Sequence, residues 1–322
     1  MLSRTLLGAL AATAAAGAAH ASQEWPQRNV RLLVGFTPGG FVDIVARAMA
    51  EQFTTGFGQT FVVENRSGAA GTIAADATSK AAPDGYTLLM GHSSPNAVAA
   101  ALYANLPYDP VRDLTPIIQI ASHPHMLSVP ATSPFHSTAD LVAAAKAAPG
   151  KLTYASAGIG ALHHIAAEMF ARAAGIELTH VPYRGSTPAV TDLVAGQVQV
   201  MFDVTPTALP QIKAGKTRAL GATTAKRLEV LPDLPTVAET VPGYEAAAWI
   251  GVGAPKGTPK AVIDILNKQI NAAVTDDKIK RRLLELGVTP LPPMTPAEFG
   301  KMMADDYAKW AKVIKSAGIK AQ

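Results

Sequence analysis

The chain has 322 residues, of which 48% are hydrophobic and 16% charged, a composition typical of a well-packed globular protein and not of a disordered one. Its formal net charge of +4 is spread along the sequence, so no dense basic block predicts nucleic-acid binding, and at most a mildly basic surface attracts small anions. Cysteine is absent, and a chain of this length can bury a large enough core to fold without disulfides.

The N-terminus has the pattern of a secretory signal. Arg4 precedes an apolar run from Leu6 to Ala19, and Ala19-His20-Ala21 fits the small-x-small cleavage rule. We predict that residues 1–21 are removed before folding; an uncleaved anchor is the alternative. The run is too short and too rich in Ala and Gly for a convincing membrane span, and without Cys no lipid anchor forms at the cleavage site, so we expect no stable membrane insertion.

The first part of the mature chain predicts a βαβαβ unit. Dense apolar runs indicate buried strands, and apolar residues at helical spacing indicate helices. The expected elements, in order, are a strand at 30–36, a glycine loop at 37–40, a helix at 41–53, a strand at 61–63, a glycine turn at 67–71, a helix to about residue 81 and a strand at 86–90.

The second part repeats that order. After a proline-rich segment at 107–116 and an extended crossing segment at 117–128, the expected elements are a strand at 152–155, a glycine loop at 156–160, a helix at 161–174, a strand at 178–183, a turn at 184–188, a helix at 189–195 and a strand at 198–202. Two βαβαβ units predict a parallel sheet in each, with ligands at the carboxyl ends of the strands.

The remaining chain predicts strands at 218–223 and 249–254 and helices at 259–274, 276–286 and 296–317, the helices at 259 and 296 beginning with Pro after a Thr cap. We therefore expect an α/β protein of two lobes. Lobe 1 comprises residues 22–121 plus 228–322, and lobe 2 comprises residues 122–227. Two connections between lobes are the usual basis of hinge closure about a ligand.

The two glycine loops predict an anion site. Each loop brings backbone N–H groups to a helix N-terminus, which carries unpaired donors and a partial positive charge. Two such ends facing each other would bind a small carboxylate from both sides. Neither loop contains Lys or Arg, so dipoles, hydrogen bonds and water must compensate the ligand's charge.

In detail the sequence resembles the tripartite tricarboxylate transporter substrate-binding receptors, also called Bug-type solute receptors. The matching motifs run in order along essentially the whole mature chain; among them are Pro38-Gly39-Gly40 with Asp43, Pro83-Asp84-Gly85-Tyr86, Pro107-Tyr108-Asp109-Pro110, Tyr154-Ala155-Ser156 with Gly158, Gly160, His164 and Glu168, His180-Val181-Pro182-Tyr183-Arg184-Gly185, and Leu231-Pro232-Asp233-Leu234-Pro235.

The resemblance implies a periplasmic receptor with the type II binding-protein fold. It implies a small organic carboxylate in the interlobe cleft, held largely by backbone groups and ordered water, and delivery to integral-membrane permease subunits. It implies no enzyme activity, no cofactor and no metal. Two positions depart from the family pattern and bear on the ligand: Phe41, where a small residue is frequent, and Ala161, where Ser or Thr is frequent.

The candidate ligand-binding residues are those of the two loops and of the strand ends beside them: Thr37, Pro38, Gly39, Gly40, Phe41, Ser93, Ser94, Asn96, Ser156, Ala157, Gly158, Gly160, Ala161, His164 and Asp203. The glycines could instead serve only tight turns, and the serines after residue 92 could be ordinary helix caps. Asp203 could contact a ligand hydroxyl or amine, or pair with Arg184. Asp43 is expected to organise its loop, since it would repel an anion.

Three alternatives stay open from the sequence. His164 and Glu168 share a helix face, but a zinc site needs a third ligand, so we expect a structural histidine with a local glutamate pair. Ser156, His164 and Asp203 could form a triad of a periplasmic α/β hydrolase, although no nucleophile-elbow motif is present. The third alternative is a carboxylate sensor that signals without transport.

Overall fold

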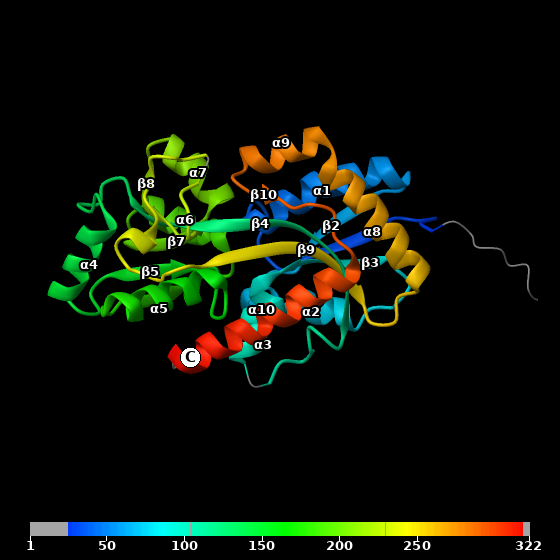
Figure 1. Cartoon of the computed structure of the whole chain (residues 1–322), viewed down its shortest axis with the longest axis horizontal. Coiled ribbons are helices and arrows are strands. Elements are labelled where there is room, and N and C mark those ends of the chain that lie inside the picture. Colours follow the sequence, from blue (N-terminus) through cyan, green and yellow to red (C-terminus); the bar gives the residue numbers. More distant parts are fainter. Residues whose placement is uncertain (1–24, 104, 229, 318–322) are drawn as a thin grey trace, which may run out of the picture.

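The computed structural model describes residues 25–103, 105–228 and 230–317. The predicted signal segment, residues 1–21, lies outside the described residues. Two lobes, each with helices packed on a sheet, are joined by long strands that run between them (Figure 1). Among the described helices, none combines the length and the apolar character that crossing a membrane requires.

Lobe 1 begins with the predicted βαβαβ unit. Its elements are β1 (Val30–Val34), α1 (Phe41–Phe57), β2 (Phe61–Asn65), the 3-10 turn η1 (Ala69–Gly71), α2 (Thr72–Ser79) and β3 (Thr87–His92). Strand β1 lies between β2 and β3 and is parallel to both. The unit ends in a π-helical turn, η2 (Ser94–Val98), which continues into α3 (Ala99–Leu102).

Lobe 2 repeats this arrangement. Its elements are β5 (Thr153–Ser156), α5 (Leu162–Ala174), β6 (Thr179–Pro182), α6 (Ser186–Val194) and β7 (Val200–Val204). Strand β5 lies between β6 and β7, again parallel to both, so the predicted repeat and its strand order are confirmed in both lobes.

Two long strands connect the lobes. β4 (Leu114–Pro130) contains the predicted crossing segment, and β9 (Ala247–Pro255) returns antiparallel to it (Figure 1). β4 also pairs antiparallel with β7, β8 (Thr217–Ala222) and β10 (Thr289–Pro290). Each lobe's sheet is therefore mixed: a parallel three-strand unit is extended by antiparallel crossing strands.

The lobe boundary follows from where β4 changes partner. It pairs with β9 as far as Pro124 and with β7 from His125 onward. Residues 237–246, which we had expected in lobe 1, place Val237 and Tyr244 in the same hydrophobic cluster as Phe170 of lobe 2. We therefore propose that the chain crosses outward near Pro124 and returns where β9 begins.

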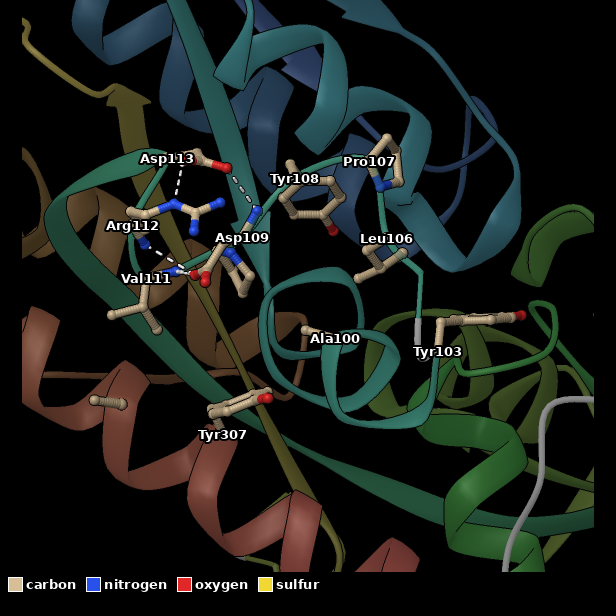
Figure 2. Close-up of a pocket in the computed structure, with 12 residues that line it drawn as sticks. Ala100, Tyr103, Leu106, Pro107, Tyr108, Asp109, Val111, Arg112, Asp113 and Tyr307 are labelled. Carbon is tan, nitrogen blue, oxygen red and sulfur yellow. Dashed lines mark hydrogen bonds and ion pairs between the residues drawn. The ribbon is translucent and has the colours of Figure 1, made fainter.

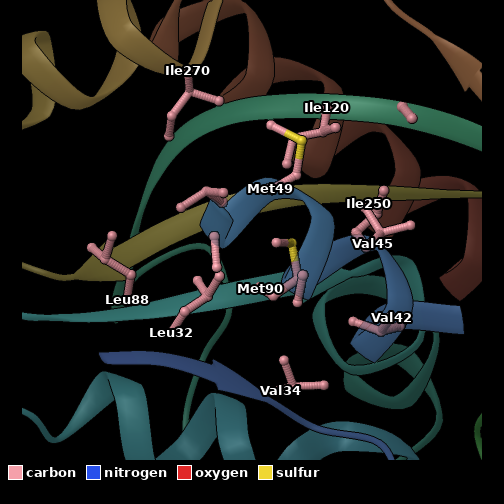
Figure 3. Close-up of a cluster of buried hydrophobic side chains, with 14 of the residues drawn as sticks. Leu32, Val34, Val42, Val45, Met49, Leu88, Met90, Ile120, Ile250 and Ile270 are labelled. Carbon is pink, nitrogen blue, oxygen red and sulfur yellow. The ribbon is translucent and has the colours of Figure 1, made fainter. Parts of the chain in front are cut away.

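The main core lies in lobe 1 and explains why these elements form. Alternate apolar residues of β1 and β3 pack against the apolar face of α1, and the crossing strands cover them (Figure 3). Buried contributors are Leu32, Val34, Val45, Met49, Leu88, Met90, Ile120 and Ile250. The core fixes the carboxyl end of β1 and the first turn of α1, which is where the first glycine loop lies.

The C-terminal helices complete lobe 1. They are α8 (Lys260–Thr275), α9 (Asp277–Glu285) and α10 (Pro296–Ala317), as predicted. Helix α10 begins with a capping box, in which Thr295 and Glu298 exchange hydrogen bonds. Helix α8 differs slightly from the prediction, because Pro259 is its N-cap and not its first helical residue. Trp310 of α10 packs with Leu162 and Ile165 of α5, so α10 contacts both lobes.

Helices α4 (Thr138–Ala147) and α7 (Thr205–Lys213) were not predicted, nor was the 3-10 turn η3 (Val237–Glu239). A capping box formed by Ser137 and Asp140 starts α4, a signal that is present in the sequence.

Candidate functional site

The first glycine loop joins β1 to α1 and is held by Asp43. This buried carboxylate accepts hydrogen bonds from the Gly39 amide (2.9 Å), from Asn65 (2.8 Å) and from Arg47 (3.0 Å). Burial alone would raise the pKa of Asp43, but these hydrogen bonds outweigh it and lower the pKa. Gly39 has a φ of 73°, which favours glycine. The prediction that Asp43 organises the loop is confirmed.

The second loop joins β5 to α5 and packs against lobe 1. Gly158 has a φ of 121°, and a Cβ added there would lie 3.5 Å from the backbone nitrogen of Ala70 in η1. Ala69 and Ala70 themselves have positive φ values of 46° and 54°, unusual for residues with a side chain. The loop thus approaches a constrained turn of the opposite lobe through backbone atoms.

Hydrogen bonds of several side chains bridge the lobes, among them one from the Thr187 hydroxyl to the Pro38 carbonyl (3.1 Å). The Thr37 and Thr187 hydroxyls are 3.3 Å apart, and the Tyr103 hydroxyl donates to the Ile159 carbonyl (3.1 Å). The Leu162 amide, in the first turn of α5, donates to Ser94 Oγ of lobe 1 (3.0 Å). The N-cap of α5 is Ala161, which supplies no side-chain cap, so a serine from the opposite lobe takes that role.

The helix ends differ in how many amides they leave for a ligand. In α1, the amides of Phe41, Val42 and Asp43 precede the first intrahelical bond, from Ile44 to Gly40. The Gly39 and Gly40 amides already donate, to Asp43 and Thr37 respectively.

In the second loop most amides have acceptors inside the protein. Gly158 donates to Ser156 Oγ, Gly160 to His164 Nδ1, and Ala161 to the Gly158 carbonyl. Together with the Ser94 contact, this leaves the His163 amide as the remaining first-turn donor of α5. Ligand contact through the amides of 157–161 thus stays a prediction, and at Gly158, Gly160 and Ala161 it requires these internal bonds to exchange.

The residues after β3 lie deep between the lobes. Ser93, Ser94 and Asn96 are all buried, in the π-helical turn and at its N-cap. Asn96 donates to the His92 carbonyl (3.1 Å), whereas its own carbonyl oxygen and the Ser93 hydroxyl have no hydrogen-bond partner among the described residues. Both groups are fully buried, and Asn96 presents an acceptor there instead of the amide donor that we expected, so a ligand contact at this position stays a prediction.

Four buried histidines lie beside these residues; the sequence analysis weighed only His163, beside His164 and Glu168 as a metal question, and none of the four was a candidate ligand-binding residue. His92 ends β3, His123 and His125 come from β4, and His163 is the second residue of α5. Neighbouring ring centroids are 5.1 to 5.4 Å apart: His92–His123, His123–His125 and His125–His163. Phe41, the first residue of α1, lies 4.0 Å from the His123 ring. This histidine cluster therefore lies between the N-termini of α1 and α5.

Burial lowers the pKa of every ring in the histidine cluster. The pKa falls to about 3 for His92 and to about 4 for His163. For His123 and His125 it falls well below the ordinary value. The rings are thus neutral at pH 7. The signal that could have found them is the i, i+2 spacing of His123 and His125, which places both side chains on one face of the predicted crossing strand.

His164 has a structural environment. Its Nδ1 accepts the Gly160 amide, and its ring stacks on His180 with centroids 4.4 Å apart. The expected pairing with Glu168 is wrong, because Glu168 accepts the Tyr154 hydroxyl (2.8 Å). Within the described ranges, His, Asp and Glu side chains do not gather in threes in an arrangement that could hold a metal ion.

The proposed triad does not assemble. Ser156 Oγ lies 2.6 Å from His180 Nε2, not beside His164. In a catalytic triad, a carboxylate accepts a hydrogen bond from the second ring nitrogen of the histidine and so orients the ring. The second nitrogen of His180, Nδ1, has no hydrogen-bond partner in the described part of the chain, so the Ser156–His180 pair lacks this third member. The serine is also fully buried and holds the Gly158 amide, which gives it a role in shaping the loop.

Asp203 lies near the end of β7. It is 1% exposed, its carboxyl accepts the Thr207 hydroxyl, and burial raises its pKa to about 7. Arg184 is exposed, so it is not placed to pair with this carboxyl. Asp203 is the register partner of Met126, which puts it on the opposite sheet face from His125. A ligand contact by Asp203 stays a prediction.

Two grooves open on the surface, and the second of them reaches the first glycine loop. One, of about 570 Å³, is lined by the Pro107–Asp113 segment, Tyr103 and Tyr307 of α10 (Figure 2). Arg112 in this groove is bonded to Asp113. The other, of about 720 Å³, lies between α1 and α9 and includes Gly39, Arg47 and Lys278. Apart from Gly39, these grooves contain none of the candidate ligand-binding residues.

Comparisons with known proteins identify the family. A family model described as "Tripartite tricarboxylate transporter family receptor" matches residues 45–319. Protein BugT of Bordetella pertussis is 36% identical over 317 residues, covering 98% of this chain and 97% of BugT.

Two solved structures from Rhodopseudomonas palustris superpose closely. Rpa4515 with adipate has a TM-score of 0.90 at 41% identity, covering 92% of this chain and 99% of that one. MatC with bound malate has a TM-score of 0.86 at 32% identity, covering 90% of this chain and 100% of that one. The repeated βαβαβ lobes, the paired glycine loops and these similarities lead to one conclusion: the chain belongs to the tripartite tricarboxylate transporter receptor family.

Proposed function

We propose that this protein is a periplasmic solute receptor that binds a small organic carboxylate between its lobes and delivers it to a membrane permease. The observation that carries the proposal is the opposition of two helix N-termini, one from each lobe, across the crossing strand β4. Helix N-termini favour anions, and a ligand that touches both ends stabilises contact between the lobes.

Carboxylates in two relatives support the ligand class. Adipate and malate, which those structures contain, are both small dicarboxylates. In this chain the first turn of α1 offers the amides of Phe41, Val42 and Asp43 as donors, and the Ser93 hydroxyl offers a further donor. Phe41 narrows the space above β4, so it is expected to restrict the ligand's shape.

A thermal-shift screen tests the proposal. A ligand that binds the folded state raises the melting temperature by an amount that grows with its concentration over its Kd. We expect at least one of succinate, malate and adipate to raise it in the mature protein. No shift with these acids or with a wider carboxylate set would contradict the proposed ligand class.

A matched pair of glycine variants then tests the place of binding. Gly39 and Gly196 have the same φ of 73°, so valine costs similar backbone strain at both, but Gly196 follows α6 and has open space around it. Gly39→Val should weaken the ligand-induced shift, and Gly196→Val should keep it. Equal shifts in both variants would contradict binding at the first loop.

Delivery to a permease requires its own test. Closure brings surfaces of both lobes into one fixed arrangement, which a membrane partner can recognise. Crosslinking the ligand-loaded receptor in cells that carry the permease should trap a complex that the unloaded receptor forms less. A receptor that binds the acid but crosslinks equally in both states would favour the sensor alternative over transport.

A further inference from the structure

The histidine cluster contains a chain of hydrogen bonds that fixes its protons. The Ser94 amide donates to His92 Nδ1 (3.0 Å), so the neutral His92 ring carries its proton on Nε2. That proton points to His123 Nε2, 3.0 Å away, which therefore accepts. The neutral His123 ring must then carry its own proton on Nδ1.

This leaves a buried donor at His123. Its Nδ1 has no hydrogen-bond partner in the described part of the chain, although the nearby Pro124 carbonyl favours the protonated ring slightly. His123 is fully buried. A buried donor without a partner destabilises the protein, and a bound acceptor would remove that cost.

His125 and His163 have still more ring nitrogens without a hydrogen-bond partner in the described part of the chain. Both nitrogens of both rings lack partners among the described residues, and the two residues are 0% and 4% exposed. As neutral rings, each offers one N–H donor and one bare nitrogen. With His123 and the Ser93 hydroxyl, four unused donors lie in one region, matching the roughly four acceptor positions of a carboxylate.

The charge of the region explains what would happen when an acid binds. Among the described residues, the groups whose charge would shift the pKa of these rings are the other histidines of the cluster, which are neutral at pH 7. His164 faces away toward Gly160 and His180, and Asp203 lies on the other face of the sheet. An arriving carboxylate would therefore be the nearest negative charge and would raise the pKa of the rings it touches.

We propose that an acid group of the ligand binds among His123, His125, His163 and Ser93, and that binding takes up a proton on a bare nitrogen of His125 or His163. This rests on the proposed function and specifies how a site without Lys or Arg neutralises its ligand. Because Ser93 belongs to lobe 1 and His163 to lobe 2, the same contact ties proton uptake to lobe closure.

Calorimetry of the mature protein tests the proposal with succinate, malate and adipate as probes. Binding enthalpies at pH 7 in buffers of different ionisation enthalpy give the number of protons taken up. We expect uptake approaching one proton and an affinity that rises by up to about tenfold for each pH unit between pH 8 and pH 6.

Variants assign the proton. His163→Asn should lower affinity about tenfold or more and reduce the uptake, since Asn can donate but cannot take a proton at this pH. His136→Asn, at an exposed site in lobe 2, should behave as wild type. Melting curves of each variant confirm that it folds.

The outcomes separate this inference from the proposed function. Binding without proton uptake, or unchanged affinity in His163→Asn, would overturn the histidine assignment while leaving a carboxylate receptor. Uptake that persists in His163→Asn and disappears in Asp203→Asn would overturn it as well, because Asp203 would be the group that titrates. If no carboxylate binds at all, the proposed function itself is contradicted.

Discussion

Acidification should destabilise this protein strongly between pH 6 and pH 5, because its buried histidines must become charged to hold a proton. An ordinary histidine has a pKa near 6.5, whereas burial lowers the pKa of His92 to about 3 and those of His163 and His164 to about 4. Between these limits the unfolded chain binds more protons than the folded one, so stability falls as the pH falls.

The size of the effect follows from those values. Each of these three histidines contributes a loss of about 1 kcal/mol of stability between pH 6 and pH 5, or about 3–4 kcal/mol together. Asp203 acts in the opposite direction: its pKa is raised to about 7, so the folded state holds its proton and gains about 1 kcal/mol over the same interval. The net loss is about 2–3 kcal/mol, and the lowered pKa values of His123, His125 and His180 add to it.

Urea unfolding followed by circular dichroism at pH 7, 6 and 5 measures this loss. His163→Asn should reduce the loss between pH 6 and pH 5 by about 1 kcal/mol, and His136→Asn, at an exposed position, should leave it unchanged. An unfolding free energy that is the same at pH 6 and pH 5 in the wild type would refute the view that these histidines are buried and neutral.

Three substitutions test the contacts that hold the site. Tyr103→Phe removes the interlobe hydrogen bond to Ile159, which is worth about 1 kcal/mol. The Kd for the bound acid, measured by calorimetry, should therefore rise about fivefold. The control Tyr307→Phe on α10 should leave the Kd unchanged. Ser94→Ala removes the acceptor of the Leu162 amide across the cleft and should likewise weaken binding more than it lowers the melting temperature; a Kd equal to wild type would argue against this contact in the bound state. Asp43→Asn should lower the free energy of unfolding in urea by about 2 kcal/mol at pH 7, and by less below about pH 4. The reason is that a carboxyl with a lowered pKa stabilises the folded state above its unfolded pKa and loses that contribution as it is protonated.

Much of the fold could be predicted because its signals are local. The apolar periodicity of residues 41–53 and 162–170 indicated α1 and α5, and the glycine loops before them indicated where each strand ends. The prolines around residue 107 excluded a helix and pointed to the crossing segment that became β4. The antiparallel pairing of β4 with β9, β8 and β10 was not predicted, since pairing between distant strands leaves no local pattern.

The site was harder to predict because its chemistry depends on contacts between lobes. Ala161 could be seen to lack a capping hydroxyl, but Ser94, which supplies one, lies 68 positions along the chain from Leu162, whose amide it accepts. His92, His123, His125 and His163 are separated in sequence and meet only when β3, β4 and α5 come together. The pairing of Glu168 with Tyr154, not with His164, depends on the same tertiary packing.

A crystal structure of the mature protein with its best-binding dicarboxylate tests the central claim most directly. We predict an acid group enclosed between the N-termini of α1 and α5, with its oxygens within hydrogen-bond distance of the first-turn amides of α1 or of the His123, His125 and His163 rings. An acid group bound instead in the groove beside Arg112, or in the one between α1 and α9, would contradict the account.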